Sequence, residues 1–345
     1  MEMLAPQVAS AWLSPCVHPV YARLVCAELR RRGWSEHDIL EGTRLKWDGL
    51  HGSNQFLSFD QIRRLVARAI ALTQCPWLGL AVGMTTQLSA HGAVGYAGMS
   101  ASTLGQLMAL IQRFAGLRQR LGRFEVDTDT RWRIRFVALH SSLDVQEYVS
   151  GHIAAGLAQL MTTVTGLSLT TAISIHWPFP EPPWAQHYRD FCQNSQFGAE
   201  HLCLDLPMEL LDTPSLAPDP QAFRSALREC ERQLQQLQLG TVTERIQRRL
   251  QEVEGEYPSL ERMAALEHVS VRTLNRLLAQ EGIRYQQLLD TVREEWACWM
   301  LIHSTASVDV IAEKLGYQDP SNFSRTFRRW LGVTPSAFRQ QRHGP

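Results

Sequence analysis

Long apolar runs are absent from this sequence of 345 residues. No run approaches the roughly 18 apolar residues that a membrane-spanning helix needs. The first residues, Met1 to Cys16, also lack the basic segment of a secretion signal. We therefore expect a cytoplasmic protein that does not enter a membrane.

Cysteine pairs are missing as well. The seven cysteines are odd in number and dispersed, and none forms a CxxC motif. This usage fits a reducing compartment and argues against a disulfide framework and a zinc site.

Signatures of catalysis and of cofactor binding are not found. The sequence has no HExxH, no histidine pair at i, i+4, no GxSxG and no glycine-rich phosphate loop. We expect neither a catalytic residue nor a bound metal or cofactor. Among the histidines, His91 fits a structural role better than contact with a ligand, and His152 and His176 are expected to be structural.

Net charge is zero, but the charge is unevenly distributed. From Pro320 to Pro345 every ionised side chain, histidines aside, is an arginine: Arg325, Arg328, Arg329, Arg339 and Arg342. Residues 251–256 are acidic by contrast. A focused basic patch on a neutral protein supplies phosphate contacts while it limits non-specific binding to nucleic acid.

The first 210 residues mix helical and strand patterns, which predicts an α+β domain. Ser58 begins a capping box for a helix through Leu72, and Thr103 caps a second helix. Residues 123–139 alternate like a hairpin that turns around Asp127 to Thr130. Further segments are predicted as helices at 17–32, 145–165 and 184–193 and as strands at 171–177 and 202–206.

A domain boundary is predicted at Thr213, where three prolines follow within eight residues. A polar helix, 221–239, comes next and ends at Gly240. It is expected to be a connector, or else part of a dimer contact. The predicted organisation is a domain of residues 1–212, a linker and connector helix of residues 213–240, and an all-α domain of residues 241–345.

Residues 259–283 have the pattern of a helix-turn-helix. Ser259 and Ser270 are expected to cap its two helices, and Ala264 is small where the second helix crosses the first. The inward residues are Met263, Ala264, Leu266, Leu274, Leu277 and Leu278. The residues left on the outer face of the second helix are Arg272, Thr273, Asn275 and Arg276.

Residues 307–333 repeat this pattern. Gly316 occupies the turn, Pro320 fits the start of the second helix, and Phe323 and Phe327 face inward. The outward residues are Ser321, Asn322 and Arg325. Thr334 caps a last helix, which begins with Pro335.

The two patterns lie about 50 residues apart: Ala264 and Ala312 are separated by 48 residues, and Arg276 and Arg325 by 49. Between them, residues 284–303 form a long helix with one apolar face. That face consists of Tyr285, Leu288, Leu289, Val292, Trp296 and Met300. A packed continuous helix would fix the distance between the two outer helices, and about 34 Å separates successive major-groove segments on one face of DNA.

One such helix pair alone is explained equally well by packing in a helix bundle and by DNA binding. Two in tandem, with outward Arg and Asn at matching positions, favour DNA binding, because Arg pairs with guanine and Asn with adenine in bidentate fashion. Ser270, Arg328 and Arg329 are expected to contact phosphates.

The segment from Ile311 to Arg339, IAEKLGYQDPSNFSRTFRRWLGVTPSAFR, resembles the signature of the AraC/XylS family of bacterial transcription regulators. The resemblance covers residues 241 to about 341. It implies that Arg272, Asn275 and Arg276 contact bases from the first reading helix, and Ser321, Asn322 and Arg325 from the second. His268 stands where many such units have Gly, so we expect it to tighten or reshape the first turn.

The N-terminal region resembles the arabinose-binding type of regulatory domain in this family, through residues 91–111, the hairpin and residues 196–214. The resemblance implies a homodimer that binds double-stranded promoter DNA and responds to an unidentified small-molecule effector in an apolar pocket. RNA polymerase would be a partner if the protein activates transcription; the sequence fits an activator or a repressor.

Two alternatives remain open from the sequence. In the first, the N-terminal domain senses nothing and only dimerises or contacts protein partners. In the second, a DNA-repair alkyl-transfer enzyme is fused to this kind of DNA-binding domain. The second alternative needs an activated thiol at Cys16 or Cys26, and Pro15-Cys16-Val17-His18 is a loose match.

Overall fold

The computed structural model of the chain describes residues 12–52, 55–128, 131–139, 142–239, 241–253 and 255–342. They form two compact units. One consists of residues 15–238, and the other consists of residues 12–14 together with the chain from Leu239 onward.

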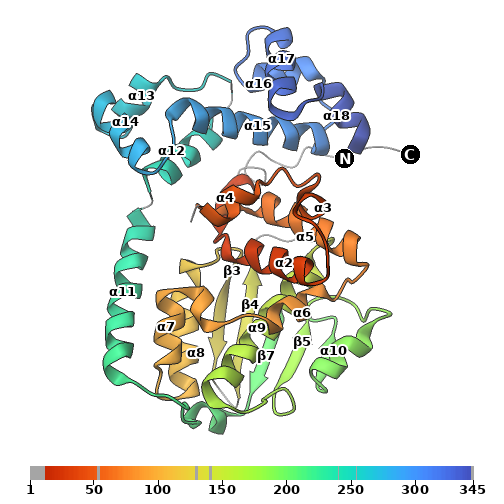
Figure 1. Cartoon of the computed structure of the whole chain (residues 1–345), viewed down its shortest axis with the longest axis vertical. Helices are drawn as coiled ribbons and strands as arrows, with labels where there is room; N and C mark the ends of the chain where they lie inside the picture. The colour runs from red at the N-terminus through yellow and green to blue at the C-terminus, as the bar shows by residue number, and fades with distance from the viewer. Residues whose placement is uncertain are drawn as a thin grey trace. The chain divides into compact units, whose positions relative to one another are not determined.

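The N-terminal unit is built on a five-stranded sheet (Figure 1). In spatial order its strands are β3 (Gly122–Asp127), β4 (Trp132–Ala138), β7 (Leu202–Leu206), β5 (Ser174–Trp177) and β6 (Ser195–Phe197). Neighbours are antiparallel except β5 and β6, which are parallel. The predicted hairpin is confirmed as β3 and β4, while the tip of its turn, Asp129 and Thr130, lies outside the described residues.

The sheet is accompanied by helices in the described part of this unit, so the predicted α+β class is confirmed. They are α2 (Val20–Arg31), α3 (Glu36–Leu40), α4 (Trp47–Gly52), α5 (Phe59–Thr73), α6 (Leu78–Met84), α7 (Ala93–Met99), α8 (Leu104–Phe114), α9 (Gln146–Thr165) and α10 (Ala185–Phe191). A small antiparallel sheet joins β1 (Pro15–Val17) to β2 (Leu57–Ser58). The caps that the sequence predicts are present: Ser58 and Gln61 form a capping box on α5, and Thr103 accepts a hydrogen bond from the Gln106 amide on α8.

The core of this unit lies where α8 and α9 meet β4, β5 and β7. Helix α6 crosses α9 closely enough that a Cβ at Gly79 would lie 2.1 Å from the Tyr148 carbonyl oxygen. Only glycine permits this approach. No single helix of the described ranges is both long enough and apolar enough to cross a membrane. Only taken together do α5 and α6 reach that length and apolarity, and the chain bends by 107° between them.

The compact N-terminal unit extends past the domain boundary that the sequence predicts at Thr213. Backbone hydrogen bonds tie the proline-rich segment to the N-terminal unit, among them Leu216 N to Val164 O at 2.8 Å and Asp219 N to Ser100 O at 3.1 Å. Helix α11 (Pro220–Leu239) then packs its apolar stripe against α7 and α8, with Cys230 fully buried (Figure 1). The division between the units falls at the end of α11, after the helix that the sequence assigns to a linker.

The C-terminal unit is all helical. Its helices are α12 (Val242–Gln251), α13 (Leu260–Leu266), α14 (Val271–Gln280), α15 (Tyr285–His303), α16 (Val308–Lys314), α17 (Pro320–Leu331) and α18 (Pro335–Arg342). Leu13 is buried in this unit, and its carbonyl accepts a 2.9 Å hydrogen bond from the Gln251 amide group. Residues 12–14 therefore do not belong to the N-terminal domain, in contrast to the predicted range of 1–212.

Helix α15 is shared by the two halves of the C-terminal unit. Its N-terminal part, through Val292, packs with α12, α13 and α14. Its C-terminal part, from Ala297, packs with α16, α17 and α18. Trp296 contacts both cores. A helix of 19 residues is about 28 Å long, so one rigid element spaces the two helix-turn-helix halves.

Candidate nucleic-acid interface and effector cavity

Helices α14 and α17 each bury one side and expose the other. Leu274 and Leu278 of α14 and Phe323 and Phe327 of α17 are fully buried. Six of the seven predicted base-contacting residues are exposed and Thr273 is half-buried; they are Arg272, Thr273, Asn275, Arg276, Ser321, Asn322 and Arg325. The predicted phosphate contacts Ser270, Arg328 and Arg329 are exposed too. The inside-outside pattern of both helices is as predicted.

The helix caps place the two reading helices in register. Ser270 caps α14 by accepting from the Thr273 amide, and Asp319 caps α17 by accepting from the Ser321 amide, with Pro320 as the first helical residue. Counted from these caps, Arg276 and Arg325 occupy the same position. The asparagines do not, because Asn275 matches Ser324. The expectation of matching Asn positions is therefore wrong, and the matched feature is the arginine.

The two turns have the same backbone although their residues differ. His268 has φ of 55° and Gly316 has φ of 74°. In both turns this residue's amide donates to the carbonyl three positions back, and the next amide donates five positions back. His268 therefore does not reshape the first turn. It adopts a left-handed conformation that is unfavourable for a residue with a Cβ.

The second reading helix carries a preformed polar pair. Asn322 Oδ1 accepts a hydrogen bond from Arg325 Nη2 on the exposed side of α17. Arg339 of the predicted basic patch serves the structure instead, because its Nη2 donates to the Ala306 carbonyl at 2.6 Å. The exposed arginines of α17 are thus Arg325, Arg328 and Arg329.

Helix α12 is bound into the first half by two carboxylates. Glu281, at the end of α14, accepts hydrogen bonds from the Val242 and Thr243 amides. These amides form the N-terminus of α12, where the dipole of that helix favours a negative charge. Glu267 lies between Arg245 and Arg249 at 2.8 and 2.9 Å. These contacts fix α12 against the C-terminal ends of α13 and α14.

The N-terminal unit contains an apolar cavity of about 130 Å³. Its wall is drawn from β1, α2, α5, α7, α8, α9 and the segment that leads into β3. Most lining residues are aliphatic or aromatic, such as Phe59, Leu107 and Leu157. Few polar groups line it; they are Tyr21, Arg63, Thr86, His91, Arg118, Gln119, Tyr148 and His152. Ligand sites commonly combine a mainly apolar wall with a few convergent polar groups.

Two histidines line this cavity. Burial lowers the pKa of His91 and of His152 to about 4, with a smaller effect of Arg118 on His91 and of His91 on His152. Both rings are neutral near pH 7. His91 lines the cavity, where it can contact a ligand. From the sequence, we expect a structural role for His91 rather than contact with a ligand. His176 lies outside the cavity, on β5, with Nε2 3.4 Å from Asp205 Oδ2.

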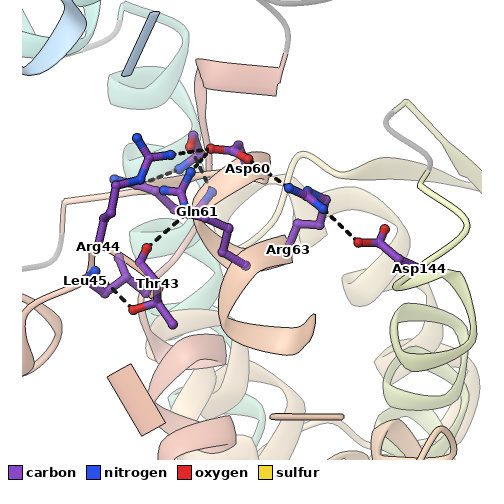
Figure 2. A network of polar contacts seen from close by, with 9 residues as sticks. Thr43, Arg44, Leu45, Asp60, Gln61, Arg63 and Asp144 are labelled. Carbon is purple, nitrogen blue, oxygen red and sulfur yellow. Dashed lines mark hydrogen bonds and ion pairs between the residues drawn. The ribbon is translucent and has the colours of Figure 1, made fainter. Parts of the chain in front are cut away.

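The arginine on one side of the cavity is already paired. Arg63 donates to Asp144 at 2.7 Å and to Asp60 at 3.4 Å (Figure 2). Asp60 is buried and also pairs with Arg44 and Arg64. The network joins α5 to the segment before α9 and holds one wall of the cavity in place.

The cysteines do not fit an alkyl-transfer enzyme. Cys16 and Cys26 are buried, and this burial raises the pKa of each thiol to about 12. Arg120 near Cys16 lowers its pKa by less than burial raises it. An acceptor thiol needs a lowered pKa and access to its substrate.

Comparisons with known proteins agree with this architecture. Residues 33–215 match the arabinose-binding domain of AraC transcription regulators, and residues 263–341 match a helix-turn-helix domain. The ornithine utilization regulator of Pseudomonas aeruginosa is 31% identical over 326 residues, which cover 93% of this chain and 95% of that protein.

Two further relatives are similar over different lengths. The transcriptional regulator VqsM of Pseudomonas aeruginosa is 25% identical and covers 77% of this chain and 84% of its own length. The transcriptional activator RhaS of Escherichia coli is 42% identical over 77 residues, which cover 22% of this chain and 28% of that protein. The chain thus belongs to the AraC family of transcription regulators and is a DNA-binding regulator with an N-terminal regulatory domain and a C-terminal helix-turn-helix domain.

Proposed function

We propose that α14 and α17 enter successive major-groove segments and read bases through their exposed faces. The observation that carries this proposal is the equivalent position of Arg276 and Arg325 on two capped helices held by one shared helix, α15. The base contacts come from Arg272, Thr273, Asn275, Arg276, Ser321, Asn322 and Arg325. Arg328, Arg329 and the amide end of α14 at Ser270 hold phosphates.

Replacement of single arginines on α17 tests this division of roles. Arg325→Ala should cost about 1–3 kcal/mol at its cognate base pair and relax the preference there. Arg329→Ala should weaken binding to all sequences alike. It should also reduce the slope of log K against log salt concentration by about one, because one phosphate contact is lost. Arg224→Ala removes the same charge from an exposed position on α11 and serves as the control.

The measurement is a selection from random duplex DNA by the full chain, followed by titrations at several salt concentrations. An unchanged base preference in Arg325→Ala would remove this arginine from base reading. A loss confined to one sequence in Arg329→Ala would contradict its phosphate role.

The N-terminal unit, in this proposal, binds a small-molecule effector in the cavity and biases a cytoplasmic homodimer between DNA-competent and incompetent arrangements. The mainly apolar lining with a few polar groups supports an effector site. RNA polymerase is the further partner if the outcome is activation.

A thermal-shift screen of the full chain against small metabolites tests the effector site. Val149→Phe narrows the cavity and should abolish stabilisation by any hit, whereas an exposed substitution such as Gln112→Ala should not. A chain that dimerises but responds to no metabolite would instead support an N-terminal unit that only dimerises or contacts protein partners.

A further inference from the structure

The second arginine of the cavity differs from the first. Arg63 has two carboxylate partners, but no Asp or Glu of the described residues lies within ion-pair distance of Arg118. The residues that line the cavity include no acidic side chain in the part of the chain that the structure describes. Arg118 thus places an uncompensated positive charge beside an apolar space.

The position of the Arg118 guanidinium is fixed. Its Nε donates to the His91 carbonyl at 2.8 Å. Its Nη2 lies over Gly92, where a Cβ would be only 1.8 Å away, and Gly92 has φ of 58°. Glycine at this position therefore makes room for the guanidinium. With Nε engaged, the two terminal nitrogens remain available, and they match the two oxygens of a carboxylate.

Other polar atoms of the same wall also lack partners. Gln119 Nε2, His91 Nε2 and Thr86 Oγ1 are buried, and none has a hydrogen-bond partner within the described ranges. Buried polar atoms without partners are costly, and a bound ligand is one way to satisfy them. Gln119 follows Arg118 in the chain, and the carbonyl of His91 accepts the Arg118 hydrogen bond, so two of these three polar atoms belong to residues next to the guanidinium.

Charge and solvation favour an anion at this place. Burial lowers the pKa of the Arg118 guanidinium, which reflects the cost of holding its charge away from water. His91 and His152 are neutral and add no positive charge. One carboxylate would pair with Arg118 and compensate its charge.

The size of the cavity limits the rest of the ligand. A cavity of about 150 Å³ in another protein holds benzene, and this one measures about 130 Å³. We propose that the effector is a monocarboxylate whose apolar body is no larger than a benzene ring, about six carbons, with its carboxylate on Arg118 and its body among the aliphatic side chains of α8 and α9. This inference rests on the proposed effector function and names the chemical class of the ligand.

Three probes with the same ring test this assignment. Phenylacetate, 2-phenylethanol and 2-phenylethylamine differ chiefly in the charge of the head group. Titration calorimetry on the full chain should give a Kd for phenylacetate roughly 10- to 100-fold lower than for the alcohol, and no detectable binding of the amine.

Variants at Arg118 identify the recognition group. Arg118→Gln should abolish the preference for phenylacetate over the alcohol and leave the affinity for the alcohol unchanged. Arg118→Lys keeps the positive charge and should retain part of the preference for phenylacetate. If Arg118 acted only through its structural hydrogen bond to the His91 carbonyl, lysine would not retain this preference. Arg224→Ala should leave all three affinities unchanged.

The outcomes separate this inference from the effector function itself. Equal binding of acid and alcohol, or tighter binding of the amine, overturns the carboxylate assignment while it leaves a small-molecule site in the cavity. Silence of all three probes also overturns it, because the argument from size then fails. The effector function itself depends on the metabolite screen and the Val149→Phe control, which do not assume a head group.

Discussion

Gly316→Ala should weaken the second helix-turn-helix unit more than an ordinary glycine substitution. Gly316 has φ of 74°, and a Cβ there would lie 2.2 Å from the Gly255 carbonyl oxygen. The same loop is held to the turn by a 2.9 Å hydrogen bond from the Gly255 amide to the Lys314 carbonyl. The added methyl group cannot be accommodated by a side-chain rotation, because the atom that it meets belongs to the backbone.

Two costs add in this variant. A left-handed conformation with a Cβ costs about 1–2 kcal/mol, and forced overpacking costs about 1–3 kcal/mol. Together they reduce the local free energy of unfolding by about 2–5 kcal/mol. Gly332→Ala is the matched control: its φ is 77°, and no heavy atom lies within 4 Å of the added Cβ. It should show only the first cost.

Hydrogen exchange of the α16 and α17 amides in the full-length variants measures this difference. A local readout is needed because a chain of two units does not define a single unfolding midpoint. Protection of these amides should fall further in Gly316→Ala than in Gly332→Ala, while amides of α5 remain unchanged in both. Equal loss in the two variants would refute the argument from the close approach of Gly255.

Two further predictions concern the first turn and the cavity. His268→Gly should raise the local stability of α13 and α14 by less than about 1 kcal/mol, because relief of the left-handed strain is partly offset by the greater freedom of glycine in the unfolded chain; exchange of the α14 amides measures it, and a clear loss of protection would contradict the strain. Lowering the pH from 7 to 5 should destabilise the N-terminal unit by about 2 kcal/mol for each of His91 and His152. The unfolded imidazole binds a proton below about 6.5, and the folded one does not until about 4, so this stability is present above pH 6.5 and is lost as the pH falls towards 4. Burial also lowers the pKa of His18 in this unit, to about 3, so His18 adds a similar loss. Hydrogen exchange of the α9 amides in His152→Phe should therefore show about two thirds of the total pH-dependent loss, and an unchanged loss would exclude His152 as a source.

Local sequence signals predicted much of the DNA-binding unit. Caps such as Ser270 and Thr334 and the apolar spacing of α14, α15 and α17 depend on neighbours within one or two turns of helix, so the sequence carries them directly. The exposed face that contains Arg276 and Arg325 follows from the same periodicity. The conformation of His268 does not, because the tertiary packing of α13 against α14 imposes a left-handed residue there.

Contacts between segments far apart in the sequence decided the extent of the two units and the close packing of their helices. The polar helix α11 appears in the sequence as a linker, but its stripe of apolar residues is buried by α7 and α8. Leu13 lies near the start of the chain and packs with helices more than 280 residues away. The need for glycine at positions such as Gly79 follows only from the close approach of the neighbouring helix, which the sequence does not show.

The sequence by itself determined that this protein carries two helix-turn-helix units and which residues of their second helices face outward, because helical periodicity and capping are local. Only the tertiary structure decided where a ligand could bind. The cavity is assembled from residues between Val17 and Leu160, and the free charge of Arg118 is apparent only when the partners of every neighbouring carboxylate are known. Long-range packing creates both the space and the unpaired charge, and no local pattern specifies either.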